Sequence, residues 1–252
     1  MRDILSEIVE HKKEELRIRK AAARRSACEI SRASGRFFKA LSGSGLRLIA
    51  EVKPKSPSAG QLSQNNLEQL LAAYGKHAHA LSVLTDEKYF AGNLALLRTA
   101  TEKTGLPVLC KDFFIDEFQV HEAYDAGADA ILLIVKILTD ETLASLHTLA
   151  LQRGMTPVVE IQNQSELERA LPLNPQVILI NNRDLTTFDI DFETTKKLAP
   201  QIPESVLVIS ASGVDTRADI ESLLPCAQRF LVGSSIMRSE SPEAKLQELL
   251  GL

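Results

Sequence analysis

Short apolar runs alternate with helix-patterned stretches along most of the chain, starting after a Ser- and Gly-rich turn at residues 42–45. The runs are rich in Val, Ile and Leu and are bounded by turn residues, which is typical of strands. We expect eight strands, over residues 48–52, 80–84, 107–110, 130–135, 157–161, 177–180, 206–209 and 230–232. The stretches between them predict helices over residues 66–78, 93–104, 117–126, 140–153, 164–170, 192–199 and 216–224.

This alternation predicts an α/β protein with a parallel sheet. A continuous apolar run such as residues 131–135 belongs in a sheet that helices cover on both faces. Eight strand–helix units of about 26 residues fill residues 46–252, which matches a (β/α)8 TIM barrel. A doubly wound open sheet is the alternative, but it calls for a Gly-rich turn after the first strand, where this chain has Glu51-Val52-Lys53. We therefore expect a single-domain TIM barrel with a helical N-terminal extension over residues 1–45.

Within the extension, residues 3–24 carry apolar positions at mixed three- and four-residue spacing, as an amphipathic helix does. Several basic residues lie in this segment, Lys12 and Lys13 among them. The acidic neighbours Glu10, Glu14 and Glu15 favour a solvated helix face over a binding site for an anionic partner.

Composition narrows the class of protein. The chain has 252 residues, 44% of them hydrophobic and 25% charged, as in an ordinary globular protein. A net charge of -4 gives no electrostatic footprint for nucleic acid, and no apolar stretch approaches the roughly 18 residues of a membrane span. The three cysteines are far apart, and the N-terminus has no apolar signal core. We expect a cytoplasmic protein, a monomer or weak homo-oligomer, without nucleic-acid or membrane partners.

Polar residues fall at the carboxyl ends of four of the expected strands, which is the end where TIM barrels carry their chemistry. Because strand residues two apart share a face, Glu51 lies with Lys53 and Asn181 with Arg183, whereas Cys110 points away from the mouth. The expected group at the mouth comprises Glu51, Lys53, Lys111, Glu160, Gln162, Asn181 and Arg183. Its opposite charges lie close together, as in sites that carry out acid–base chemistry.

The last two strands are followed by Ser212-Gly213 and by Gly233-Ser234-Ser235. Many barrels bind phosphate at these two loops through backbone N–H groups, and Gly lets the backbone approach the oxygens closely. The sequence therefore predicts a small phosphate ester as the ligand.

Other candidates carry less weight. His77 and His79 have a spacing that suits a metal, but His79 precedes its strand and so belongs to the opposite end of the barrel. We expect no metal and no cofactor. Lys136, which follows the fourth strand, fits a place at the mouth and a place in solvent equally well.

The residues at the strand ends resemble the motifs of the indole-3-glycerol phosphate synthase family. The similarity runs over essentially the whole chain, and its most specific parts are the first-strand segment IAEVKPKSPSAG at residues 49–60 and the KDF segment at residues 111–113. The NNRDL segment at 181–185 and the FLVGSS segment at 230–235 agree with it. The resemblance implies a cofactor-free ring closure of 1-(2-carboxyphenylamino)-1-deoxyribulose 5-phosphate with loss of carbon dioxide and water.

The resemblance also implies a role for each residue of the site. Lys111 is expected to act as general acid on the sugar carbonyl, and Lys53 to meet the substrate carboxylate and to serve in proton transfer. From the residues themselves, we expect partial burial and neighbouring cations to lower the pKa of Lys111. Glu160 is expected to stabilise cationic charge or act as base, with help from Glu51. From the residues themselves, we expect Asn181 and Arg183 to orient hydroxyl groups or the carboxylate of the substrate. Substrate-binding positions are Ser56, Phe90, Phe113, Leu132, Ile134, Arg183, Leu185 and Phe188, and phosphate-binding positions are Lys53, Ser56, Ser212, Gly213, Gly233 and Ser234.

Three positions depart from the family pattern. Ala211 stands where the family usually has Glu, Leu179 where it has Gly, and Gln162 where it often has His. Leu179 would place a large side chain in the barrel interior. We expect the reaction to be retained at a lower rate. The alternatives are another phosphate-ester barrel enzyme such as a sugar-phosphate isomerase, and a silent barrel that binds phosphorylated metabolites without turnover.

Overall fold

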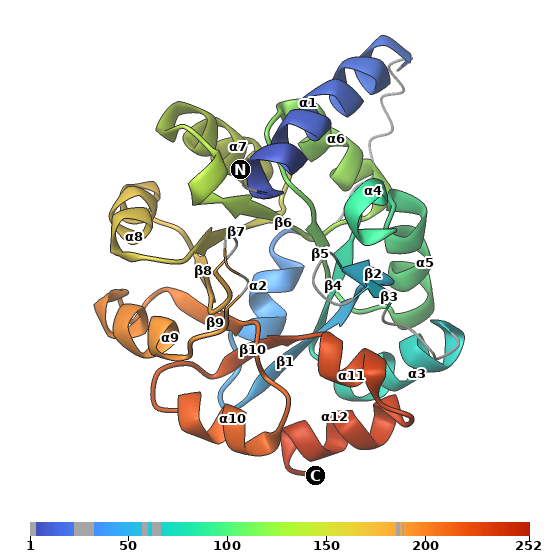
Figure 1. Cartoon of the computed structure of the whole chain (residues 1–252), viewed down its shortest axis with the longest axis vertical. Coiled ribbons are helices and arrows are strands. Elements are labelled where there is room, and N and C mark those ends of the chain that lie inside the picture. Colours follow the sequence, from blue (N-terminus) through green and yellow to red (C-terminus); the bar gives the residue numbers. More distant parts are fainter. Residues whose placement is uncertain (1–3, 23–32, 57–59, 62–66, 185–186, 188) are drawn as a thin grey trace.

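A computed structural model describes residues 4–22, 33–56, 60–61, 67–184, 187 and 189–252. Eight parallel strands form a closed barrel inside a ring of helices, which is the TIM-barrel architecture expected from the sequence (Figure 1). All eight expected strands are confirmed to within two residues. In barrel order they are β1 (Arg47–Val52), β10 (Arg229–Val232), β9 (Leu207–Ala211), β8 (Val177–Asn181), β7 (Thr156–Ile161), β6 (Ala130–Ile134), β5 (Val108–Lys111) and β4 (Ala80–Leu84).

Several helices of the outer ring begin where a side chain satisfies a backbone N–H group of the first turn. Asn93, Asp116 and Asn163 each accept a hydrogen bond from a first-turn N–H, as N-cap residues do. The expected helices are confirmed as α3 (Leu67–His77), α5 (Leu94–Thr104), α6 (Glu117–Ala126), α7 (Asp140–Gln152), α8 (Gln164–Ala170), α9 (Glu193–Leu198) and α10 (Arg217–Leu223).

The structure adds elements that the sequence pattern did not indicate. They are α2 (Arg36–Leu41), α4 (Glu87–Phe90), α11 (Ser234–Arg238), α12 (Pro242–Leu250), a small hairpin of β2 (Lys55–Ser56) and β3 (Gly60–Gln61), and single 3-10 turns at Val135–Ile137, Leu171–Leu173 and Ala199–Gln201. Most are too short for hydrophobic periodicity to reveal them. No helix in the described part of the chain has the length and apolar character that a membrane crossing needs.

Alternation along the strands separates two hydrophobic clusters. Leu109 and Leu179 belong to the cluster inside the barrel, whereas Leu48 and Cys110 belong to the cluster between barrel and helices. The expected orientation of Cys110, away from the mouth, is therefore confirmed. Burial raises the pKa of its thiol to about 12.

The N-terminal segment covers both ends of the barrel. The expected helix is confirmed as α1 (Ile4–Ala22), whose Leu5 joins the inner cluster from the mouth. Helix α2, visible through the ring of strands in Figure 1, inserts Phe37 and Leu41 at the other end, where Arg229 Nε donates to the Leu41 carbonyl at 3.0 Å. The solvated-face interpretation is wrong for Lys12, which is fully buried.

Candidate active site

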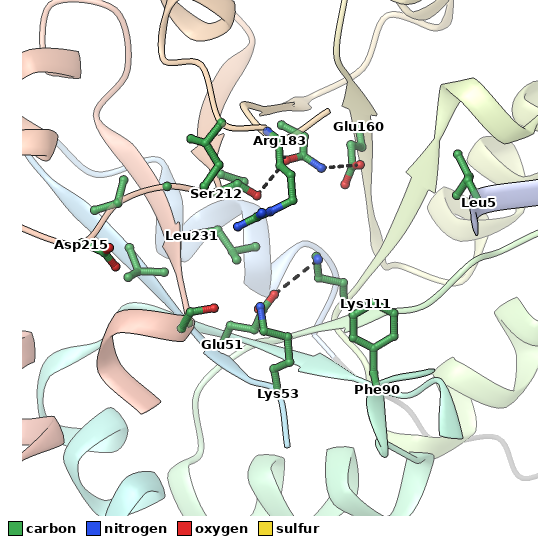
Figure 2. A pocket seen from close by; sticks show the side chains of 18 of the residues that line it. Leu5, Glu51, Lys53, Phe90, Lys111, Glu160, Arg183, Ser212, Asp215 and Leu231 are labelled. Atoms are coloured by element: carbon green, nitrogen blue, oxygen red, sulfur yellow. Dashed lines mark hydrogen bonds and ion pairs between the residues drawn. The ribbon is translucent and has the colours of Figure 1, made fainter. Parts of the chain in front are cut away.

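The carboxyl ends of the strands enclose a cavity of about 390 Å3 at the barrel mouth. Figure 2 shows charged side chains from separate strands pointing into it. The structure brings together the five residues expected to carry the chemistry, and all five line this cavity: Glu51, Lys53, Lys111, Glu160 and Asn181.

Glu51, which is almost fully buried at the end of β1, lies between two lysines. Lys53 Nζ is 2.9 Å from one of its carboxylate oxygens, and Lys111 Nζ is 3.4 Å from the other. Burial raises the pKa of Glu51, but the two ammonium groups outweigh it and lower the pKa to about 2. Glu51 is therefore a fixed anion that holds both lysines at the cavity.

Gly233, at the end of β10, leaves the space that the Glu51 carboxylate occupies. A Cβ atom at this position would lie 2.7 Å from Glu51 Oε1 and 2.9 Å from Glu51 Cβ. Any larger residue at 233 would therefore displace the anion at the centre of the lysine pair.

Glu160 faces Glu51 from β7 and belongs to a chain of polar contacts. Asn181 Nδ2 donates to Glu160 Oε1 at 3.1 Å, and Ser212 Oγ donates to Asn181 Oδ1 at 2.8 Å. Burial raises the pKa of Glu160, and the charge of Lys111 offsets this only in part. The pKa values of the two carboxyl groups, Glu51 and Glu160, are thus shifted in opposite directions. Active sites use such a difference to separate a group that stays ionised from one that exchanges protons.

The expectation of a lowered pKa for Lys111 is wrong in sign. Burial does lower the pKa of this ammonium group, but the charges of Glu51 and Glu160 more than offset it, and the pKa is raised. Lys111 is therefore protonated at neutral pH, which is the form in which a lysine donates a proton.

The loops expected to hold phosphate lie at another side of the same cavity. Ser212 and Gly213 have φ angles of 70° and 94°, and a Cβ at 213 would come within 2.5 Å of Ile190. Both residues line the cavity with Gly233 and Ser234. Arg183 and Arg238 line it as well, and their charges suit an anion. For Ser56 only the backbone, in β2, is described.

Aromatic rings supply an apolar wall. The rings of Phe90 and Phe113 lie 6.1 Å apart at 36°, and both line the cavity. Leu132 and Ile134 are buried in the inner cluster and are not among the residues that line the cavity, so their contact with substrate stays a prediction. Leu185 and Phe188 lie outside the described residues.

Sequence reasoning missed part of this wall. Ile4, Leu5 and Ile8 of α1 line the cavity opposite the strands, and Figure 2 shows Leu5 entering from the side of that helix. Their helical spacing predicted an apolar face, but spacing does not identify the surface that such a face covers. The cavity-lining residues Ile190, Val214 and Leu231 were also missed.

The three positions that depart from the family pattern lie in or beside the site. Leu179 is fully buried beside Glu160 in the strand register, so the expected large side chain in the barrel interior is confirmed. Ala211 lines the cavity next to Asn181 in the register. Gln162 donates from its side-chain amide to the Arg183 carbonyl.

Residues considered as metal ligands have other contacts. His77 Nε2 lies 3.2 Å from Glu243 Oε1, and the Leu48 backbone N–H donates to His79 Nδ1 at 3.1 Å. Within the described residues, no three His, Cys, Asp or Glu side chains group as a metal site would require. Lys136 is exposed and does not line the cavity.

Comparison with known proteins agrees with this geometry. The chain matches the family model described as indole-3-glycerol phosphate synthase over residues 5–249. It is 46% identical over 219 residues to the indole-3-glycerol phosphate synthase of Aquifex aeolicus, covering 85% of each chain. With the enzyme of the same name from Lachnospira eligens it shares 40% identity over 253 residues, covering 98% of this chain and 93% of the relative.

A solved structure shares the fold alone. The 3-hexulose-6-phosphate synthase from Salmonella typhimurium superposes with a TM-score of 0.61 at 12% identity, covering 82% of this chain and 97% of the other.

Proposed function

The chain belongs to the indole-3-glycerol phosphate synthase family, and on that premise we propose that it closes the indole ring of 1-(2-carboxyphenylamino)-1-deoxyribulose 5-phosphate in tryptophan biosynthesis. The reaction forms one carbon–carbon bond and releases carbon dioxide and water. The observation that carries the proposal is the arrangement of an ionised Glu51 between two lysines, with Glu160 facing them across one cavity.

The first step is attack of the aryl carbon that bears the carboxylate on the ketone carbon of the sugar. The ketone oxygen gains negative charge as the bond forms, and the protonated ammonium of Lys111 donates a proton to it. Lys53 pairs with the substrate carboxylate and orients the aryl carbon. The attack leaves the aryl nitrogen as a positively charged iminium. When the carboxylate departs as carbon dioxide, the electron pair of its bond to the ring returns to the ring and neutralises the iminium.

The second step is loss of the new hydroxyl group as water. Lys53, released from the departed carboxylate, donates a proton to the leaving oxygen. The CH2 carbon next to the ring nitrogen gives up one proton to form the indole double bond, and the nitrogen keeps its hydrogen. The raised pKa of Glu160 suits it to accept that proton, and the hydrogen bond from Asn181 orients its carboxylate. Glu51 stays ionised and compensates the cationic charge throughout.

The two ends of the substrate match the two sides of the cavity. The phosphate suits the side formed by Ser212, Gly213 and Gly233, where Arg183 supplies positive charge. The aryl ring suits the apolar side formed by Phe90 and Phe113. In this orientation the sugar ketone lies between the two ends, where the lysines and carboxylates converge.

The test is the appearance of indole fluorescence when purified protein meets the carboxyphenylamino-deoxyribulose phosphate. The chain contains no Trp, so the product signal rises above a low protein background. We expect Lys111→Met to reduce kcat by about a thousandfold, because it removes the general acid and one of the two cations that hold Glu51. The matched control is Lys103→Met, which alters an exposed lysine on α5 that pairs with Glu68.

Three results would contradict the proposal. The first is folded native protein that binds the substrate without producing indole or carbon dioxide. The second is rearrangement of the sugar without carbon dioxide release, which would indicate an isomerase. Full activity in Lys111→Met would remove this lysine from the mechanism.

A further inference from the structure

Lys12 is a fully buried lysine in a helix whose other basic residues reach solvent. Its Nζ lies 2.9 Å from Asp86 Oδ2, 3.0 Å from Asp112 Oδ1 and 3.1 Å from Glu15 Oε2. The side chains of Lys12 and Asp86 have no exposed surface, and that of Asp112 is 9% exposed. By contrast Lys13, the next residue, is 60% exposed and pairs with Glu10 within its own helix.

Each aspartate also fixes the backbone of a segment that forms the active site. Asp86 Oδ1 accepts from the Tyr89 N–H at 2.7 Å and so begins α4, the helix that carries Phe90. Asp112 follows Lys111 directly and accepts from the Phe113 N–H at 2.7 Å. The two segments that Lys12 joins therefore present the expected general acid and both rings of the apolar wall.

Further contacts hold the same arrangement. Thr85 Oγ1 donates to Asp112 Oδ2 at 3.0 Å, which ties the end of β4 to the end of β5. Tyr89 OH donates to Glu7 Oε1 at 2.9 Å. Arg19 donates a hydrogen bond to Glu122 of α6, and α1 lies beside α6 in Figure 1. Helix α1, which supplies Leu5 to the cavity, is thus attached to both segments, and Lys12 is the contact with the deepest burial.

We propose that Lys12 is a positioning residue of this enzyme, whose buried ammonium fixes Lys111 and the Phe90–Phe113 wall relative to α1. The inference rests on the proposed function for its kinetic readout and on geometry for its structural one. Without this cation, two carboxylates would share a buried space with no positive charge between them, and like charges in that setting separate or take up a proton. Separation would move the turn after β5 and, with it, Lys111.

The decisive variant is Lys12→Met, which keeps the length and apolar stem of the side chain and removes its charge. We expect kcat to fall about thirtyfold while KM changes less than about threefold, because a displacement near 1 Å at the reacting groups affects the rate more than binding. Lys13→Met is the control and keeps the native rate. Circular dichroism establishes that each variant is folded at the assay temperature.

A second variant keeps the inference testable if Lys12→Met does not fold. Asp112→Asn retains Lys12 and the shape of the cluster but weakens one ion pair, and we expect a smaller loss of kcat in the same direction, about fivefold. A crystal structure of either variant gives the readout that does not depend on turnover. In it, the Lys111 Nζ to Glu51 distance or the Phe90 to Phe113 separation should change by more than about 0.5 Å.

The two hypotheses fail differently. If native protein shows no turnover, the proposed function fails, and the crystallographic distances still decide the role of Lys12. If native protein is active and a folded Lys12→Met or Asp112→Asn variant keeps both kinetic constants within about twofold, with Lys111 and Phe90 in place, Lys12 is a structural ion pair only and the inference is overturned.

Discussion

Two charged clusters lie at the same end of the barrel and have opposite arrangements. In the first, the anion Glu51 lies between Lys53 and Lys111, whose side chains are 17% and 23% exposed. Glu160, which lines the same cavity, completes this cluster. In the second, the cation Lys12 lies between Asp86 and Asp112, and solvent hardly reaches any of the three. We call them the open cluster and the closed cluster.

This difference in exposure distinguishes charged groups that are placed to act on a substrate from charged groups that fix the positions of the acting groups. In the open cluster the lysines remain accessible, which the proposed function requires for their contact with the substrate carboxylate and ketone oxygen. In the closed cluster the charges pair with one another inside the protein. Burial lowers the pKa of Lys12, but its carboxylate neighbours more than offset this effect, so the pKa is raised. A buried charge with its partners in place fixes geometry, whereas a half-buried one beside a cavity is available for chemistry.

The largest effect expected from breaking the open cluster, beyond loss of Lys111, is that of Glu160→Gln. We expect kcat to fall about a hundredfold, because the amide cannot accept a proton. The pH profile sharpens the test. Burial raises the pKa of Glu160, so native activity should decline as pH falls through a value above the usual glutamate pKa of about 4.3, where the base becomes protonated. The residual activity of Glu160→Gln should lack this decline.

Glu168→Gln, on the exposed face of α8, is the matched control and should keep both the rate and the pH profile of the native protein. An unchanged acidic decline in Glu160→Gln would assign the titration to another group. Glu160 would then belong with Glu51 as a fixed charge, and the open cluster would contain no base.

Much of the open cluster was accessible from sequence, and the closed cluster was not. Alternation along strands and the rule that barrel chemistry lies at carboxyl strand ends together predicted that Glu51, Lys111 and Glu160 meet. Both rules depend only on the position of a residue within its own strand. Lys12 lies on the same buried helical stripe as Leu5 and Ile8, whereas Lys13 lies off it. Helical spacing does not identify its partners, however, because Asp86 and Asp112 lie on other segments far along the chain.

The sign of the Lys111 pKa shift was beyond sequence for a similar reason. Burial and attraction to carboxylates act in opposite directions on a lysine, and their balance depends on distances of a few ångströms to Glu51 and Glu160. Helix α2 illustrates a further limit, since its six residues are too few for periodicity to indicate a helix.

An intermediate effect is expected from Gly233→Ala, which disturbs the open cluster without removing a charge. The added Cβ would lie 2.7 Å from Glu51 Oε1, so the carboxylate must shift and the lysines with it. We expect kcat to fall about tenfold. The φ angle of Gly233 is -133°, outside the left-handed region that favours glycine.

Gly75→Ala in α3 is the control for this change, because its Cβ would meet Thr104 at an ordinary 3.8 Å. Native kinetics in Gly233→Ala, measured with the same fluorescence assay, would mean that the position of Glu51 tolerates displacement. The open cluster would then depend on its charges more than on its geometry.

The smallest effect is expected from Thr85→Val beside the closed cluster, and it separates stability from catalysis. The buried Thr85 hydroxyl donates to Asp112 Oδ2 at 3.0 Å, and valine has nearly the same shape but no donor. We expect the free energy of unfolding in urea to fall by about 1.5 kcal/mol, because a buried carboxylate oxygen loses one of its partners. Lys12 still holds the carboxylate, so kcat should stay within about twofold of the native value. The same is expected of the control Thr99→Val, at a half-buried threonine whose hydroxyl donates to the Ala95 carbonyl within α5. A tenfold loss of kcat in Thr85→Val would show that Asp112 needs every one of its contacts to position Lys111. The closed cluster and its neighbours would then affect catalysis as one network, and not through the Lys12 ammonium alone.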